Sequence, residues 1–335
     1  MTTTRTYSWA TLPLDTAEII DGSLKLDETW SPYGQGSVRI KTPADTAQLD
    51  PRADFLPIAI TASHAEGLPM GYPTNTVFNL AGRGRSITDD GTTMITLATD
   101  EAMLGDYLGR NLSPGTSLLA VCNYVLGTVI PGTGVGVASI DGDLTDFGTA
   151  LQWRYGVDAL TYLEPLLQYC GAKLWQDVTG YTWHLTSDPI SVAADPVIIE
   201  KVKTFTDTIS RDSDWYNYVQ VKWAWEDDAP VFNLATSPGS SPSPQRGFFT
   251  ERTFPGAESP GAGGLVVPAA AGLLPRVVSK GRTVEFTAMN NFHPNLRPGW
   301  PLQVTDELLP VTGTIQSVSW DFGTDEMTVV LRDIE

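Results

Sequence analysis

The side chains that most often do chemistry are sparse in this sequence. It contains three histidines and two cysteines, which are His64, His184, His293, Cys122 and Cys170. No HExxH motif is present, and no Cys or His pair has the spacing of a zinc site. His184 falls within an alternating strand pattern and both cysteines fall on apolar helical stripes, so we interpret them as packing residues. A Cys–His nucleophile pair would need an adjacency in space that spacing alone does not establish.

Carboxylates are plentiful, and two clusters could supply the acid pair of a glycosidase. These clusters are Asp89–Asp90 and Glu226–Asp227–Asp228. With 39 Asp and Glu residues, such neighbours are expected by chance. The ten tryptophans and eleven tyrosines could build a sugar-binding face, although aromatic residues in alternating strands more often fill a core. Carbohydrate binding or hydrolysis therefore remains one hypothesis.

Two stretches share only part of the pattern of known binding loops. "DGDLTD" (141–146) has Gly142 at the second position and no Glu at the EF-hand distance, so we predict a turn. "PGTGVGVAS" (131–139) does not lie between a strand and a helix, as a dinucleotide fingerprint would, so we predict a loop. No GxSxG or GxxxxGK[ST] motif occurs. We therefore predict no catalytic residue, no cofactor site and no metal site.

Composition indicates a β-rich protein of two or three domains. The chain has 335 residues with 31 Gly and 24 Pro, which favours many turns. The net charge of −18 disfavours tight binding of DNA or RNA, but would suit a channel through which nucleic acid slides. The N-terminus lacks a secretory signal pattern, and no apolar run is long enough for a spanning helix. We expect a soluble protein made in a cytoplasm, without stable membrane association.

Residues 1–108 have the strand and turn pattern of a small β barrel or sandwich. Alternation predicts that Ile20, Leu24, Leu26 and Trp30 share one strand face and that Val38 and Ile40 share another. Turns are expected at Gly22, 31–36 and 88–92, and further strands at 56–62 and 92–99. A short helix is predicted over 100–109, with Asp100 as its N-cap.

Residues 109–195 read as an α+β unit. One helix is predicted over 113–127, ended by Gly127. A second is predicted over 158–171, capped by Asp158 and ended by Gly171. A hairpin over 172–186 should follow, with Tyr181, Trp183 and Leu185 on one face.

Residues 196–335 return to β structure. Strands are predicted over 216–226, 282–289, 300–305, 313–323 and 326–333, with a bulge between Ile315 and Val318. The last three should share one sheet, paired with 216–225 or 282–289. The Pro- and Gly-rich segment at about 227–280 is predicted to be an insertion that projects from this domain and whose apolar patches need a partner.

Several stretches occur in an order that resembles a known family. They are "GSLKLDETWSPYGQGSVRI", "ALTYLEPLLQYCGAKLWQDVTGYTWHL", "DTISRDSDWYNYVQVKW" and "NNFHPNLRPGWPLQVTD", followed by "GTIQSVSWDFGTDEMTVVLRD". Together they resemble the baseplate-hub, or tail-tip hub, proteins of bacteriophage tails, which are often called minor tail proteins in siphophages of actinobacteria. The closing stretch, with "LRPG", "GxIxSV" and "MTVxL", carries the resemblance most specifically.

The resemblance implies two tube-like β-barrel or split-barrel domains, 1–108 and 196–335, on either side of an α+β domain, 109–195. It implies a homotrimer whose six barrels mimic the tail tube at the virion tail tip. Its partners would be the distal tail or tail tube protein, the tape measure protein, and tip or fibre proteins. DNA would pass through an acidic lumen without being bound. The resemblance supplies no catalytic residue.

The alternative hypothesis is a carbohydrate-binding or wall-hydrolysing β protein of the host-recognition apparatus. No peptidase, lysozyme or fibre-like segment follows the last predicted strand. Any wall-degrading activity is therefore expected to belong to a partner.

Overall fold

The protein is mainly β, with few helices. The computed structural model describes residues 5–11, 17–29, 31–52, 57–64, 75–110, 114–140, 147, 151–210, 215–224, 231–236, 246–253, 269–289, 293 and 295–334. The turn predicted at 141–146 and the acids at 226–228 lie outside these residues, as does Trp30. Among the described residues, no helix is long and apolar enough to cross a membrane.

The first part of the chain forms antiparallel strands. They are β1 (Arg5–Thr11), β2 (Ala17–Asp27), β3 (Gly34–Lys41), β4 (Pro57–His64), β5 (Asn75–Ile87) and β6 (Thr92–Ala98), with the 3-10 helix η1 (Ala47–Leu49) between β3 and β4. They pair in the order β1-β4-β5-β6-β3-β2, and β1 also makes a short ladder with β2. The strands predicted at 56–62 and 92–99 are confirmed as β4 and β6, and the turn at 88–92 is confirmed by hydrogen bonds between Thr88 and Thr92.

Gly22 lies inside β2 and not in a turn, which corrects the prediction. The β2–β3 register shifts between Ile19 and Asp21, and this bulge reverses which face the side chains take. Ile19 is therefore buried while Ile20 is 49% exposed, although Leu24 is buried as expected. Gly22 has φ +146°, and a Cβ built on it would lie 2.3 Å from the Ser37 carbonyl oxygen. Only glycine fits this position without a shift of the backbone.

The last part of the chain extends the same sheet. Its strands are β10 (Val197–Ile199), β11 (Thr204–Ile209), β15 (Arg282–Met289), β16 (Pro301–Val304), β17 (Val311–Asp321) and β18 (Glu326–Arg332). The prediction that the last three share one sheet is confirmed, and of the two expected partners, 216–225 and 282–289, the sheet contains 282–289, because β16 pairs with β17, β17 with β18, and β18 with β15. The predicted bulge is also confirmed, by a register shift between Ile315 and Ser317.

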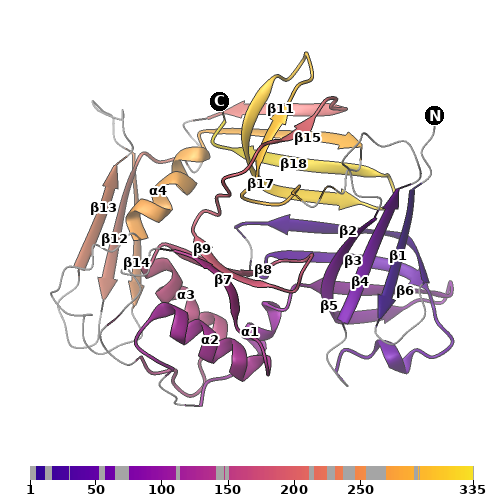
Figure 1. Cartoon of the computed structure of the whole chain (residues 1–335), viewed down its shortest axis with the longest axis horizontal. Coiled ribbons are helices and arrows are strands. Elements are labelled where there is room, and N and C mark those ends of the chain that lie inside the picture. Colours follow the sequence, from indigo (N-terminus) through magenta and orange to yellow (C-terminus); the bar gives the residue numbers. More distant parts are fainter. Residues whose placement is uncertain are drawn as a thin grey trace.

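β2 and β17 join the two parts into one large sheet (Figure 1). Their register places Leu24 opposite Trp320 and Leu26 opposite Val318. All four side chains are buried in one hydrophobic core that both parts of the chain share. The sheet is open at β11 and at the second half of β5, so the last part of the chain does not close into a barrel of its own as its strand pattern suggests.

A second body packs beside the large sheet (Figure 1). Its elements are α1 (Ala102–Asp106), α2 (Leu118–Val129), β7 (Val135–Ser139), α3 (Ala159–Tyr169), β8 (Ala172–Gln176), β9 (Trp183–Ser187), β12 (Tyr218–Ala224), β13 (Val231–Thr236), β14 (Gly247–Thr253) and α4 (Ala269–Ser279). The strands form two small sheets, β7-β9-β8 and β13-β12-β14. Side chains from these elements share a second hydrophobic core.

The helices of the second body follow their predicted caps. The Asp158 carboxylate accepts the Thr161 backbone N–H at 2.8 Å, and Gly171 follows α3 with φ +58°. Gly127, by contrast, does not end α2, which continues to Val129 because the buried apolar stripe continues through that residue.

Several local predictions for this body are wrong. Residues 135–139, predicted as loop, form β7, which pairs in parallel with β9. Tyr181 lies in the β8–β9 loop with φ +55° and is 40% exposed, whereas Trp183 and Leu185 are buried on one face as expected. The described parts of 227–280 do not project as an insertion: Ala270 and Val277 of α4 are buried in the second core, beside β12.

Candidate functional site

The large sheet packs one face on the core and leaves the other open. At the β2–β17 junction, Leu24 and Trp320 are buried, while Lys25 and Ser319 lie opposite each other on the other face. A cavity of about 840 Å³ lies over this open face. Its lining comes from β2, β3, β5, β6, β17 and β18 and is largely small and polar, including Ser23, Gln35, Thr96, Ser319 and Thr328. The open face is therefore a continuous polar surface across both parts of the chain.

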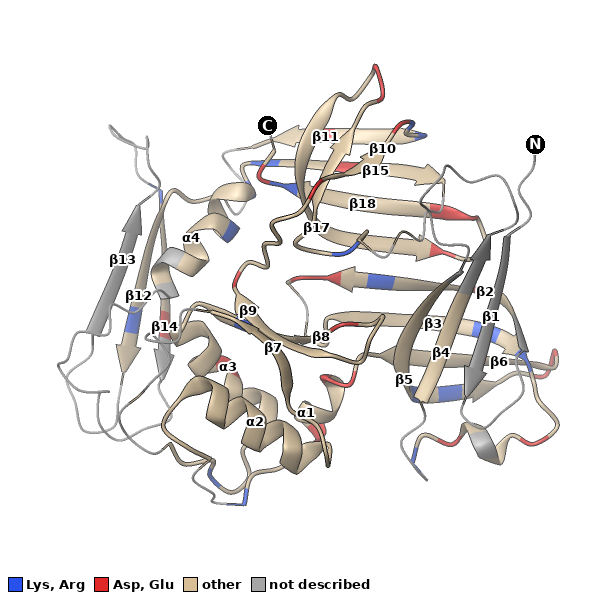
Figure 2. Ribbon diagram, in the orientation of Figure 1, with Lys and Arg blue, Asp and Glu red and all other residues tan. Residues whose placement is uncertain are grey.

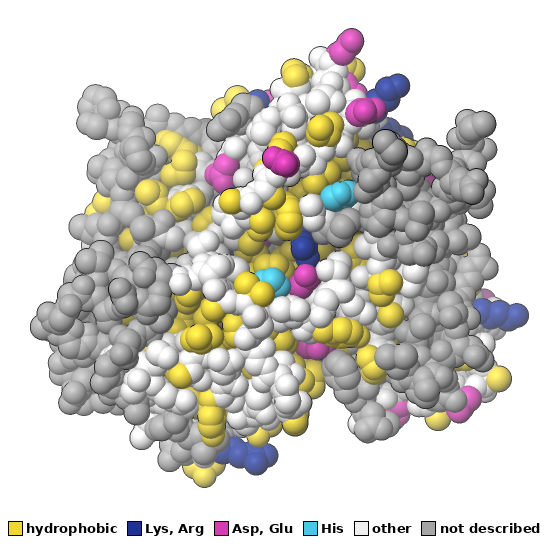
Figure 3. All heavy atoms as spheres, in the orientation of Figure 1, with side chains coloured by type: hydrophobic (Ala, Val, Ile, Leu, Met, Phe, Trp, Pro, Cys, Tyr) yellow, Lys and Arg dark blue, Asp and Glu magenta, His cyan; other side chains and the backbone are white. Residues whose placement is uncertain are grey.

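Charged residues of both signs lie along the large sheet (Figure 2), and several of them form ion pairs. Lys25 Nζ lies 2.9 Å from the Asp27 carboxylate, and Arg83 Nη2 lies 2.5 Å from that of Asp106. Arg39 pairs in the same way with Asp21. On the face of the molecule seen in Figure 3, the described residues carry scattered charged side chains of both signs, and the basic ones do not gather into one patch there.

A buried ion pair lies where the large sheet meets the second body. Glu28, which directly follows β2, accepts two bonds from the Arg332 guanidinium, from Nε at 2.6 Å and from Nη2 at 3.1 Å. Arg332 Nη2 also donates to the Ile190 carbonyl oxygen at 2.5 Å. Burial raises the pKa of Glu28, and the hydrogen bonds and charge of Arg332 oppose that shift. The pair ties the first part of the sheet to the last strand.

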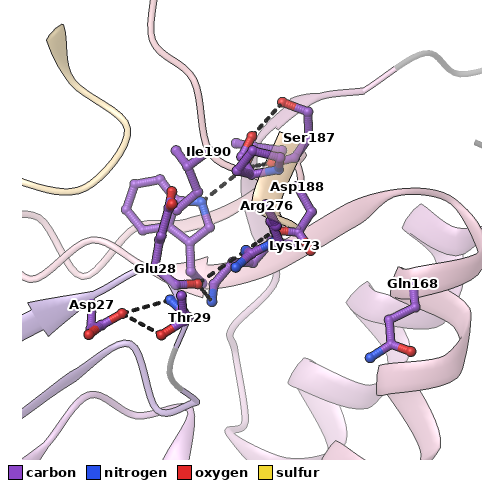
Figure 4. A network of polar contacts seen from close by, with 12 residues as sticks. Asp27, Glu28, Thr29, Gln168, Lys173, Ser187, Asp188, Ile190 and Arg276 are labelled. Carbon is purple, nitrogen blue, oxygen red and sulfur yellow. Dashed lines mark hydrogen bonds and ion pairs between the residues drawn. The ribbon is translucent and has the colours of Figure 1, made fainter. Parts of the chain in front are cut away.

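Two cationic side chains of the second body donate hydrogen bonds to the backbone of Glu28 (Figure 4). Lys173 of β8 donates to the Glu28 carbonyl oxygen, and Arg276 of α4 donates to the same oxygen at 3.3 Å. Arg276 Nε also donates to the Asp188 carboxylate at 2.8 Å. The junction of the two bodies at Glu28 is thus built from charged side chains that hydrogen-bond to one another and to the Glu28 carbonyl oxygen.

A second buried carboxylate joins the two bodies at the start of α1. Glu101 accepts backbone N–H groups from Tyr33 and, at 2.7 Å, from Gln176. Asp100, predicted to cap the helix, instead accepts the Gln176 side-chain amide at 2.7 Å, so that prediction is wrong. Burial raises the pKa of Glu101 to about 7. The sequence contained no signal for this role beyond two adjacent acids.

His184 and the two cysteines lie in packing positions. His184 stacks on Trp175 with ring centroids 4.4 Å apart, and burial lowers its pKa. Cys122 and Cys170 are buried free thiols, and burial raises the pKa of Cys170 to about 12, so its reactive thiolate is disfavoured. Within the part of the chain that the structure describes, no group of three or more His, Cys, Asp and Glu could hold a metal ion. The side chain of His64 lies outside the described residues.

The acid pair Asp89–Asp90 forms part of a turn. Asp90 accepts bonds from Thr88 and from both the hydroxyl and the backbone N–H of Thr92, which lower its pKa to about 2. A carboxylate held ionised in this way is unsuited to act as a general acid.

Comparison with known proteins shows likeness in structure and none in sequence. No family model matches the chain, and no curated protein matches it by sequence. The tail protein from Neisseria meningitidis MC58 is similar with a TM-score of 0.66 at 11% identity, over 98% of this chain and 96% of that one. The 43 kDa tail protein of prophage MuSo2 from Shewanella oneidensis is similar with a TM-score of 0.61 at 14% identity, over 98% of this chain and 96% of that one.

A component of the E. coli type VI secretion system, described as structurally similar to the T4 bacteriophage tail proteins gp27 and gp5, gives a TM-score of 0.58. The identity is 12%, over 96% of this chain and 75% of that one. The chain therefore has the fold of these tail and secretion proteins along nearly its whole length.

Proposed function

We propose that the chain is a structural subunit of a phage tail tip, the baseplate hub that extends the tail tube and connects it to tip or fibre proteins. One observation carries the proposal. A single wide sheet runs through both β-rich parts of the chain, with its core on one face and an open polar surface on the other. The fold likeness to tail proteins over 98% of the chain supports it.

In this proposal the large sheet is a section of tube wall. The strands of 1–108 and of 196–335 that belong to the large sheet supply two tube-like units, and three copies form a ring of six units, as the family resemblance implies. The β2–β17 ladder would then be the seam between two units within one copy. The second body, in which β12, β13, β14 and α4 join the elements of 109–195, forms the intervening domain and faces neighbouring rings or tip proteins.

The open face would line a channel through which DNA passes without being held. Cations of the open face already have carboxylate partners, as in the ion pairs Lys25–Asp27 and Arg39–Asp21. Binding of a phosphate chain requires cations that can release their counterions to it. Small polar side chains and a net charge of −18 both favour transit over binding. The acidic character of the lumen is part of this proposal.

The partners follow from this position in the virion. The ring would contact the distal tail or tail tube protein above, the tape measure protein within, and tip or fibre proteins below. The role is structural, and no catalytic step is assigned to the chain.

Deleting the gene from the phage or prophage that encodes the chain tests the proposal. Tails should then fail to assemble or should lack their tip, and expression of the chain in trans should restore them. Normal tails in the deletion strain would contradict the proposal. Hydrolysis of cell-wall polymer by the isolated chain, abolished by single Asp or Glu changes, would instead favour the carbohydrate hypothesis.

A further inference from the structure

The second half of β5 and β11, at the two ends of one path through the large sheet, each have an edge that pairs with no strand among the described residues. β4 pairs with β5 only as far as Ala81, and residues 82–87 pair with β6 alone. At the other end, β11 pairs with β15 alone, and each residue from 204 to 209 is exposed. Open strand edges recruit further strands unless they are protected.

We propose that these two edges bind each other between copies, with residues 82–87 of one copy antiparallel to residues 204–209 of the next. This inference rests on the proposed hub function and specifies how its ring is held. Each neighbouring pair along β5-β6-β3-β2-β17-β18-β15-β11 is antiparallel, so strand directions alternate along the whole path. The two end strands therefore run in opposite directions, and a head-to-tail contact continues the antiparallel pattern.

Apolar side chains are exposed on the core side of both edges. Ile87 lies opposite Thr93, which is buried, and is itself 48% exposed. Phe205 lies opposite the buried Phe286 and is 41% exposed, and Ile209 at the end of the same strand is 77% exposed. The core face thus reaches both edges without being covered there.

The charges of the two edges are complementary. Residues 82–87 include Arg83 and Arg85 and no acid, whereas residues 204–209 include Asp207 and no base. Arg85 Nη1 is buried and has no hydrogen-bond partner in the described part of the chain. Asp207 accepts bonds from Arg282 at 2.9 and 3.2 Å, and a carboxylate can accept more than two.

One antiparallel register brings together both the opposite charges and the exposed apolar side chains of the two edges. Arg85 and Ile87 lie on the core side of β5, opposite Ile95 and Thr93, and Phe205 and Asp207 lie on the core side of β11. Placing Arg85 opposite Asp207 in an antiparallel pair also places Ile87 opposite Phe205. Shifting the register by two residues would set Asp207 against Ile87, which leaves the carboxylate facing an apolar side chain.

A cysteine pair tests this register in the full chain. The double variant Ile87→Cys/Phe205→Cys, mildly oxidised in assembled tail tips, should give covalent dimers and trimers on a non-reducing gel. A mixture of the two single variants should give dimers only, because each copy then carries one half of the link. The control pair Ile87→Cys/Ile209→Cys, offset by four residues along the strand, should cross-link at least tenfold less.

The failure of this inference is distinguishable from the failure of the hub proposal. In one result, tail tips contain the Ile87→Cys/Phe205→Cys chain in a ring and yet show no cross-link; in another, that chain cross-links no more than the Ile87→Cys/Ile209→Cys control. Either result would overturn the edge pairing and leave the hub role standing. Tail tips that lack the chain altogether would overturn both.

A charge exchange gives a second readout that does not depend on cysteines. Arg85→Glu should reduce incorporation of the chain into tail tips several-fold, and the double variant Arg85→Glu/Asp207→Arg should restore it. A double variant that is worse than the single one would also contradict the register.

Discussion

Glu28 and Arg332 bind each other through two hydrogen bonds, at 2.6 and 3.1 Å, although 304 residues separate them in the sequence. The side chains are 1% and 4% exposed. Lys173 and Arg276 of the second body donate to the carbonyl oxygen of the same Glu28. One residue therefore connects both parts of the large sheet and the second body.

Breaking this pair should destabilise the fold strongly. Arg332→Met leaves the Glu28 carboxylate buried without its partner, which typically costs about 3–5 kcal/mol of unfolding free energy. Chemical denaturation of the full chain measures the loss. The matched control is Arg282→Met, since Arg282 pairs with Asp207 near the surface, where side-chain exposures are 40% and 30%; such a pair is worth about 0–1 kcal/mol. Equal losses in the two variants would contradict the role given to Glu28.

Gly22→Ala should be far more damaging than the same change in a surface turn. The new Cβ would lie 2.3 Å from the Ser37 carbonyl oxygen, so β2 and β3 would have to separate. Gly91→Ala is the control, because Gly91 also has positive φ (+80°) but has nothing within 4 Å of the added atom. We expect about 1 kcal/mol at Gly91 from backbone strain and at least about 2 kcal/mol more at Gly22. Similar thermal midpoints for the two variants would show that the bulge tolerates a side chain.

The Glu101 junction should make stability depend on pH. Burial raises the pKa of Glu101 from 4.5 to about 7, so the folded state holds this proton more tightly than the unfolded state. The contribution of Glu101 is therefore full below about pH 4.5 and is lost as pH rises through 7, by up to about 3 kcal/mol. Urea denaturation between pH 5 and pH 8 measures it.

Glu101→Gln is the matched control for that titration. The variant should remove this part of the pH dependence, because an amide does not titrate, while its overall stability falls because its NH₂ replaces one acceptor of a backbone N–H. Identical pH dependence in the variant and the unsubstituted chain would mean that Glu101 does not control it.

Alternating strands and helix caps could be predicted from local sequence. Alternation predicted that the strands that end the chain share one sheet, and Asp158 identified the start of α3. These features depend on near neighbours in sequence, which a single chain displays directly.

The junctions could not be predicted, because their partners are far apart in sequence. Nothing near Glu28 or Glu101 signals Arg332 or Gln176. The bulge at Gly22 was missed because glycine occurs both in turns and in bulges. The Pro- and Gly-rich composition of 227–280 concealed β13 and β14, which pair with β12, and α4, whose Ala270 and Val277 are buried in the second core.

An image of the assembled tail tip tests the central claim most directly. At a resolution that traces strands, the map should show three copies of this chain in a ring coaxial with the tail tube, with the open face of the β2–β17 sheet turned toward the channel. A map that places the chain outside the tube wall, as single copies or with its open face turned outward, would contradict the proposal.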